Sequence, residues 1–142
     1  MRPIIGLKLK LISDNMSKRA NNSLQALGLT ISQHRVIAYL SGCPEYTTEL
    51  KELERQFHVA QATMAGTAQR LEAKGLVTAV HHPSDKRIKM IRLTEEGLEL
   101  SRKSLEDFRR GDAEMVAGLS EEDLSTLNRL LDKVYSNLRS EE

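Results

Sequence analysis

Long apolar runs are missing from this sequence of 142 residues. A membrane-spanning helix needs at least about 18 consecutive apolar residues, and no such run occurs. Near the amino terminus, Lys8 and Lys10 interrupt the apolar residues 4–7, so we expect no signal peptide there. These absences predict a cytoplasmic protein. The length predicts a single domain, residues 1–142, that is large enough for a real core.

Cysteine is nearly absent: Cys43 is the only one. A single cysteine excludes an intrachain disulfide framework. It lies between Gly42 and Pro44, without a local cluster of basic residues. Nothing in the sequence indicates the activated thiol that a redox-sensing cysteine requires, although a redox switch stays open as an alternative.

Signatures of catalysis and of metal binding are missing too. The sequence has no glycine-rich loop of the kinds that cradle phosphates, and no Ser/His/Asp or Cys/His set at a recognisable spacing. Four histidines raise zinc as an alternative, but His81 and His82 are adjacent in an expected strand and would point to opposite faces. We therefore expect no enzyme, no bound metal and no cofactor.

The first feature that the sequence does contain is a helix that ends at a glycine. Residues 62–74 are mostly good helix formers. Met64, Ala68 and Leu71 recur at three- and four-residue spacing, which gives this helix one apolar face. Gly75 is placed where a glycine ends a helix.

Two short strands are predicted next, at residues 77–82 and 88–93. Pro83, Ser84 and Asp85 lie between them and indicate a turn, which continues with Lys86 and Arg87. Neither strand alternates cleanly, so the sequence leaves open which face is buried. A helix followed by a hairpin with a cationic tip is typical of a winged helix-turn-helix. The predicted fold class is therefore mainly α with a small β-hairpin wing.

Three helices are predicted before this stretch. Gly28 ends the first, which covers residues 7–27, and Thr30 with Gln33 has the spacing of a capping box for the second. Thr47 or Thr48 is expected to cap the third. The turn Phe57-His58-Val59 follows that helix, and we expect a left-handed backbone at His58.

Two long helices are predicted after the hairpin. Thr94 caps the first, which Gly111 bends or ends, and Ser120 with Asp123 has capping-box spacing for the second. Over all the helices outside residues 60–75, the positions expected to face the core are Val36, Ile37, Tyr39, Leu40, Leu50, Leu53, Phe57, Leu98, Leu100, Leu105 and Phe108.

The last helix carries a denser apolar stripe than a small domain needs to bury at its own edge. Pairing of the terminal helices of two chains would cover it, so we expect a homodimer. The alternative is intrachain packing on the second helix. The residues expected at the dimer interface are Leu7, Leu11, Ile12, Leu124, Leu127, Leu131, Val134 and Leu138.

Charge is unevenly distributed behind the net charge of +1. Residues 60–93 hold six basic and two acidic residues, whereas residues 94–142 hold seven basic and thirteen acidic ones. A positive central stretch and an acidic tail favour nucleic-acid contact at one end of the molecule, with ordinary surface charge as the alternative.

Five segments stand out by their order and spacing: RLEAKGLV at 70–77, DKR at 85–87 and LTEEG at 93–97, with helix starts GLTISQ at 28–33 and LSEEDL at 119–124. In these segments the sequence resembles the MarR family of transcriptional regulators. The resemblance implies a DNA-binding lobe at 30–93 and helical dimerisation regions at 1–27 and 94–142. Family members often have Gly at His58, Ser or Thr at Ala60, and arginine at Gly66. These departures weaken the helix cap and offer fewer hydrogen-bonding groups to bases.

The side of helix 62–74 opposite its apolar face is the expected reading surface. Gln61 and Gln69 can form bidentate hydrogen bonds to adenine, and Thr63 can bond a base or a phosphate. Arg70 is interpreted as a phosphate contact or an internal ion-pair partner. The DNA-binding candidates here are Gln61, Ala62, Thr63, Ala65, Gly66, Gln69 and Arg70.

The turn of the hairpin supplies the remaining DNA-binding candidates. A guanidinium at the tip suits the negative potential of the minor groove, which assigns that role to Arg87. Asp85 is interpreted as the partner that orients Arg87, and Lys86 and Lys89 would attract phosphates. The alternative is a solvated turn.

The resemblance further implies a dimeric repressor or activator of transcription, whose effect a small ligand often relieves. A two-fold dimer predicts a palindromic operator in double-stranded DNA. The implied ligand is a small aromatic or anionic molecule, and by position His34, Arg35 and Tyr39 could line its site. Because the reading surface is rich in alanine and glycine, the alternative function is a winged-helix protein-interaction module without DNA binding.

Overall fold

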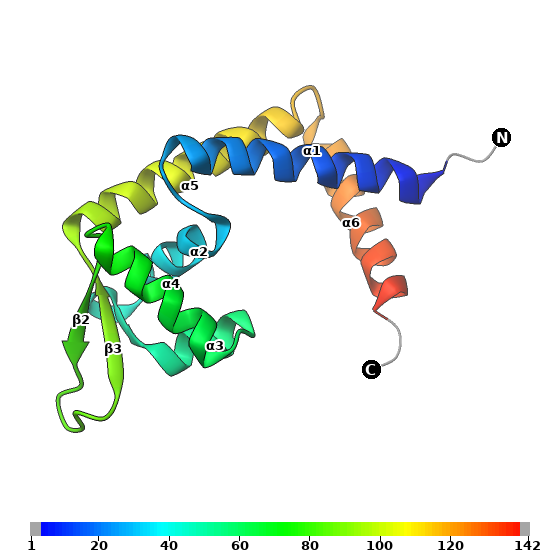
Figure 1. Ribbon diagram of the computed structural model, residues 1–142. Coiled ribbons are helices and arrows are strands. Elements are labelled where there is room, and N and C mark those ends of the chain that lie inside the picture. The colour runs from blue at the N-terminus through cyan, green and yellow to red at the C-terminus, as the bar shows by residue number, and fades with distance from the viewer. Residues whose placement is uncertain (1–3, 140–142) are drawn as a thin grey trace. The chain divides into compact units, whose positions relative to one another are not determined.

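The computed structural model describes residues 4–139 (Figure 1). The outermost residues of the expected dimerisation regions, 1–3 and 140–142, lie outside the described residues. No helix within that range is long and apolar enough to cross a membrane. In chain order the described elements are α1 (Ile5–Ala26), α2 (Ile31–Ser41), the 3₁₀ turn η1 (Pro44–Tyr46), β1 (Thr47–Glu49), α3 (Leu50–Phe57), α4 (Gln61–Ala73), β2 (Val77–His81), β3 (Lys89–Leu93), α5 (Glu95–Met115) and α6 (Glu121–Leu138).

The chain forms two compact units, one up to Phe108 and one from Arg109 onward, and α5 crosses from the first into the second. The first unit holds α2, α3, α4 and a three-stranded antiparallel sheet in the order β1-β3-β2. This arrangement confirms the predicted fold class, a mainly α protein with a β-hairpin wing. Figure 1 shows the hairpin of β2 and β3 projecting beyond the helices of this unit.

The core of the first unit lies between these helices and one face of the sheet. In α2, Val36, Ile37 and Leu40 are fully buried as expected, and α3 contributes Leu53. The sheet turns Val77, Ile91 and Leu93 inward, which settles the face that the sequence left open. In the hairpin Val77 pairs with Leu93, and Ala79 pairs with Ile91.

Several helices start or end at the local signals that the sequence predicts. Thr30 and Gln33 form a capping box at α2, and His58 adopts a left-handed backbone with φ 51° after α3. Gly75 has φ 74°, a conformation that glycine tolerates best. The Thr94 hydroxyl accepts a hydrogen bond from the Gly97 N–H at 3.1 Å and donates one to the Gly75 carbonyl at 2.7 Å. It therefore ties the start of α5 to the end of α4.

Three predictions about the elements are wrong. Thr47 and Thr48 do not cap α3 but form β1, which pairs with β3, and the N-cap of α3 is Glu49. The α5 helix continues through Gly111 to Met115, so Gly111 does not end it. Leu105 is 36% exposed, and the buried positions of α5 are instead small residues: Gly97, Ser101 and Ser104.

The second unit contains the end of α5 and the whole of α6. Ser120 and Asp123 form the predicted capping box at the start of α6. No residue of α6 is buried, and its apolar stripe includes Leu127 at 39%, Leu131 at 41% and Leu138 at 79% exposure. This surface is available for a further contact.

Candidate nucleic-acid interface

The α4 helix presents one packed face and one exposed face, as its sequence predicts. Met64, Ala68 and Leu71 are buried together with Thr67, whose hydroxyl donates to the Thr63 carbonyl at 3.1 Å. Ala60, the N-cap, gives no side-chain hydrogen bond, in agreement with its departure from the family pattern. The DNA-binding candidates on this helix are exposed or half-buried: Gln61, Ala62, Thr63, Ala65, Gly66, Gln69 and Arg70.

Arg70 is the only basic residue of α4. Its side chain forms no hydrogen bond and no ion pair with any other described residue, so the expected internal ion pair is absent from residues 4–139. The guanidinium lies over Gly66: a Cβ added there would be 3.5 Å from both terminal nitrogens. Lys74, just after the helix, is used differently, because its ammonium donates to the Gly28 carbonyl and, at 2.7 Å, to Gln33 Oε1.

The hairpin tip holds Arg87 against Asp85. The Arg87 Nε and Nη2 atoms donate to the two oxygens of the Asp85 carboxylate, each at 3.1 Å, and the Arg87 backbone N–H donates to Oδ1 at 3.0 Å. These bonds lower the pKa of the Asp85 carboxyl and raise the pKa of Arg87. The Arg87 side chain is nevertheless 91% exposed. A fixed, ionised pair thus presents a guanidinium to solvent.

His82 holds the turn in which this pair lies, a role that sequence reasoning missed. Its Nδ1 atom lies 3.2 Å from the backbone nitrogens of Ser84 and Asp85. Because a backbone N–H can only donate, Nδ1 must accept, and the ring proton is then on Nε2. Nε2 lies 3.9 Å from the Glu49 carboxylate of β1. A histidine before proline gave no signal of this role.

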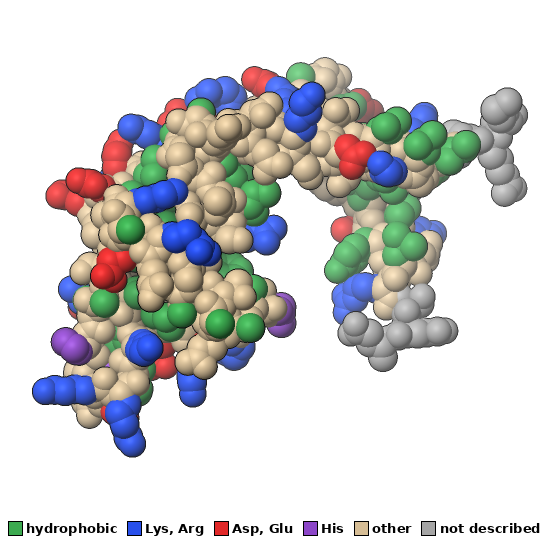
Figure 2. Space-filling view, in the orientation of Figure 1, with side chains coloured by type: hydrophobic (Ala, Val, Ile, Leu, Met, Phe, Trp, Pro, Cys, Tyr) green, Lys and Arg blue, Asp and Glu red, His purple; other side chains and the backbone are tan. Residues whose placement is uncertain are grey.

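Cations gather at the end of the hairpin, as Figure 2 shows for Lys and Arg side chains. Lys86, Arg87 and Lys89 are exposed. Arg92, on β3, instead donates through Nε to the Thr47 hydroxyl at 3.0 Å and so connects β3 with β1. Exposed cations therefore lie at the tip and continue onto β3, where Lys89 and Arg92 are exposed too.

The three expected ligand-binding residues do not converge. The His34 ring stacks on Phe108 with centroids 4.7 Å apart and lies 3.0 Å from the Ser104 hydroxyl through Nδ1. Burial, and then the nearby Arg35, lower the pKa of His34. Tyr39 packs edge-on against Phe57 with centroids 5.8 Å apart. Two of the three side chains are thus engaged in packing within the first unit.

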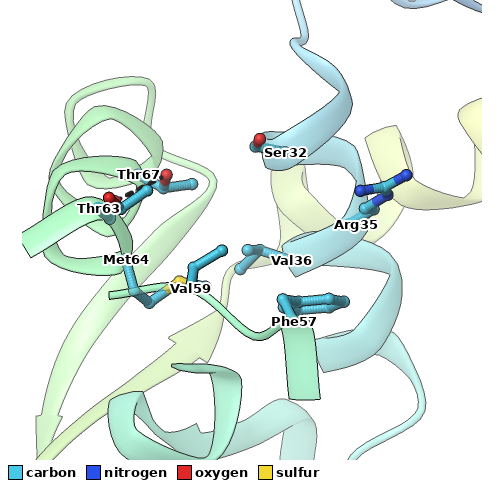
Figure 3. Close-up of a pocket in the computed structure, with 8 residues that line it drawn as sticks. All are labelled: Ser32, Arg35, Val36, Phe57, Val59, Thr63, Met64 and Thr67. Atoms are coloured by element: carbon cyan, nitrogen blue, oxygen red, sulfur yellow. Dashed lines mark hydrogen bonds between the residues drawn. The ribbon is translucent and has the colours of Figure 1, made fainter. Parts of the chain in front are cut away.

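Arg35 does line a pocket between α2 and α4 (Figure 3). The floor is apolar, and Arg35 stands at the rim with its guanidinium turned away from Met64 and Val59. The pocket has a volume of about 60 Å³, whereas pockets for drug-sized ligands measure roughly 300–1,000 Å³. Its lining residues are Ser32, Arg35, Val36, Phe57, Val59, Thr63, Met64 and Thr67.

Cys43 shows no activation for redox chemistry. Its thiol donates to the Tyr39 carbonyl at 3.3 Å, and burial, followed by the charge of Glu52, raises its pKa. A raised pKa disfavours the reactive thiolate. Over residues 4–139, no group of three or more His, Cys, Asp or Glu residues is arranged to hold a metal ion.

Comparison with known proteins identifies relatives of this chain. A family model described as MarR family matches residues 27–88. The HTH-type transcriptional regulator YdgJ of Bacillus subtilis is 30% identical over 89 residues, which cover 63% of this chain and 54% of YdgJ. The HTH-type transcriptional repressor IacR of Pseudomonas putida is 27% identical over 117 residues, 82% of this chain and 69% of IacR. The match thus spans about half the length of YdgJ.

A solved structure shares the fold of the chain. The MepR–DNA complex of Staphylococcus aureus superimposes with a TM-score of 0.76 at 23% identity, covering 96% of this chain and 99% of MepR. At this identity the likeness establishes the fold, a winged helix-turn-helix flanked by long helices.

Proposed function

Because this chain belongs to the MarR family, we propose that it is a dimeric, sequence-specific DNA-binding transcriptional regulator, and in particular a repressor that a small ligand relieves. IacR is named a repressor, and MepR has been crystallised with DNA. In this proposal the protein acts by binding rather than by catalysis, and it works in the cytoplasm on double-stranded DNA.

One observation carries the proposal. The same lobe, residues 30–93, contains an exposed polar side of α4 and an arginine at the hairpin tip whose guanidinium is held in a fixed orientation. On α4, the polar residues Gln61, Thr63 and Gln69 are exposed. At the hairpin tip, Arg87 is held out by Asp85. A helix fits the major groove, which is about 12 Å wide. An extended arginine suits the narrower minor groove beside it.

Apolar surface that each unit leaves exposed supports the proposed dimer. Leu7, Leu11 and Ile12 of α1 are 49–52% exposed, and α6 exposes Leu127, Leu131 and Leu138. Large apolar side chains exposed along a helix in this way are typical of an interaction site. We propose residues 1–27 and 94–142 as the dimerisation regions. A two-fold dimer would present two α4 helices to half-sites about 34 Å apart, which requires a palindromic operator.

Relief by a ligand rests on the family alone. The pocket beside Arg35 is small, and His34 and Tyr39 lie outside its lining. A small aromatic or anionic molecule remains the proposed ligand class, with Arg35 as the cation that would attract its charge. A shift of the bound fraction of DNA on titration with salicylate or benzoate would support this part of the proposal.

Selection from a random duplex library with the purified protein tests the function. We expect recovery of a palindrome, with binding that weakens steeply between about 0.05 and 0.3 M salt, because cations of the protein replace counterions on the phosphates. A folded dimer that enriches no sequence and binds no duplex would favour the protein-interaction module, which the small residues Ala62, Ala65 and Gly66 of the reading surface motivate.

A further inference from the structure

The centre of the exposed side of α4 is built from residues that barely project. Ala62, Ala65 and Gly66 leave a shallow surface there. Flanking glutamines offer neutral hydrogen-bonding groups, but a guanidinium is the group best suited to read guanine, because it donates to both the O6 and N7 acceptors. At positions 61–69 the helix has no basic residue.

Arg70 fills this gap from one turn further along the helix. Side chains on a helix lean toward its amino terminus, so residue 70 covers the surface around residue 66. With Gly66 in that place, the guanidinium settles where a longer side chain would begin, 3.5 Å from the position of an added Cβ. Its charge therefore lies on the reading surface and not at the end of the helix.

The donors of Arg70 are also unused. No described residue accepts a hydrogen bond from its side chain, whereas Nε and Nη2 of Arg87 already donate to the Asp85 carboxylate. Bidentate recognition of a base needs two parallel N–H donors on one guanidinium. Arg70 keeps all five of its N–H donors for such a contact, whereas Arg87 keeps three.

We propose that Arg70, lying over Gly66, reads a guanine in the major groove and is the principal specificity-determining residue of α4. This inference rests on the proposed DNA-binding function and goes beyond it, since it replaces the phosphate contact expected for Arg70 with a base contact. In this proposal Gly66, which has no side chain, leaves the space that the Arg70 guanidinium occupies.

The test is a specificity profile measured on the selected operator. Each base pair of the palindrome is replaced symmetrically, and affinities are measured at fixed salt for the wild type, Arg70→Ala and Arg70→Lys. The wild type should prefer guanine at one symmetric position by roughly 5- to 100-fold. Both variants should lose that preference and keep the preferences at other positions, because lysine retains the charge but not the fork of donors.

Variants at Gly66 test the same idea without touching the arginine. Gly66→Val fills the space under the guanidinium and should reproduce the lost preference, while Gly66→Ala, whose Cβ makes only an ordinary contact at 3.5 Å, should keep it. Circular dichroism and the melting temperature establish that each variant folds. Lys86→Ala serves as the control for a purely electrostatic loss, which should be uniform across operator sequences.

The outcomes separate this inference from the function on which it rests. A uniform loss of affinity in Arg70→Ala over all operator variants, with a reduced salt slope, would identify a phosphate contact and overturn the inference while DNA binding stands. A wild-type protein that enriches no sequence overturns both. Loss of preference at one symmetric position alone supports the base contact.

Discussion

The hairpin tip and the exposed side of α4 hold their arginines in opposite ways. Arg87 is fixed by three hydrogen bonds to Asp85, and the turn around it is fixed by His82. Arg70 has no acceptor among the described residues and lies over a glycine. One guanidinium is oriented before any ligand arrives, and the other keeps its donors free.

The difference fits two kinds of groove. The minor groove is read by its width and negative potential, so a guanidinium gains from being held at one place with part of its donors already bonded. The major groove is read by specific donors and acceptors on base edges, which requires unoccupied N–H groups. We therefore expect substitutions at the hairpin tip to change affinity, and substitutions at Arg70 to change sequence preference.

Loss of Arg87 should have the largest effect on affinity. A charge-assisted hydrogen bond contributes about 1.5–3 kcal/mol, so Arg87→Ala should weaken operator binding by about 10-fold or more. The dimer should stay folded, because the Arg87 side chain is 91% exposed. Gel-shift titrations at fixed salt measure this, with Lys86→Ala as the control that removes a neighbouring charge only. Unchanged binding by Arg87→Ala would reject its role.

Removal of Asp85 should have a smaller effect, because two consequences oppose each other. Asp85→Ala releases Arg87 but also removes a negative charge that repels phosphates. The repulsion is screened at high salt, so at about 0.3 M we expect binding about two- to fivefold weaker than wild type, in line with exposed ion pairs. At low salt the difference should shrink. Equal binding at both salt concentrations would show that Arg87 needs no partner.

The pH dependence of this pair follows from the lowered pKa of Asp85. Its bonds to Arg87 hold that pKa below the usual 3.8. The pair is therefore complete above that value and is lost only as the pH falls through the lowered pKa. The affinity ratio of the wild type to Asp85→Ala should then be constant from about pH 8 to about pH 5. A ratio that changes within this range would point to another titrating group in the wing.

His82 should matter less than Asp85, since it acts through the turn. His82→Ala removes the acceptor for the Ser84 and Asp85 N–H groups, and we expect binding about two- to threefold weaker, as for one modest hydrogen bond. An asparagine side chain can accept from a backbone N–H two residues on, so His82→Asn should restore part of the affinity. Equal affinities for the two variants would show that the ring contributes something other than its acceptor.

Local sequence signals were enough to predict most of the elements. The capping boxes at Thr30 and Ser120, the left-handed His58 and the stop at Gly75 each depend on neighbouring residues only. The winged fold followed from their order along the chain, and the resemblance to the family supplied the expected DNA-binding and dimerisation surfaces.

Features that depend on distant residues were missed. The strand β1 exists because Thr47 pairs with Arg92, 45 positions away. The buried Ser101 and Ser104 of α5 have no hydrophobic pattern to mark them, and the role of the latter depends on His34 of α2. The place of Arg70 was predictable in principle, because a side chain that leans toward the start of the helix meets Gly66.

The smallest effect on DNA binding is expected for a substitution at Gly66, which tests whether the exposed side of α4 is less constrained than the hairpin tip. A glycine inside a helix costs about 0.5–1 kcal/mol relative to alanine, and an added Cβ meets only ordinary contacts. Gly66→Ala should thus raise the urea midpoint while operator affinity stays within about twofold of the wild type. Gly75→Ala is the matched control: its φ of 74° disfavours alanine, so the same substitution should lower the midpoint. Both must be measured at one protein concentration, because dimerisation contributes to stability. A midpoint that falls for Gly66→Ala would mean that α4 tolerates no added atom there, and the surface would then be as constrained as the hairpin tip.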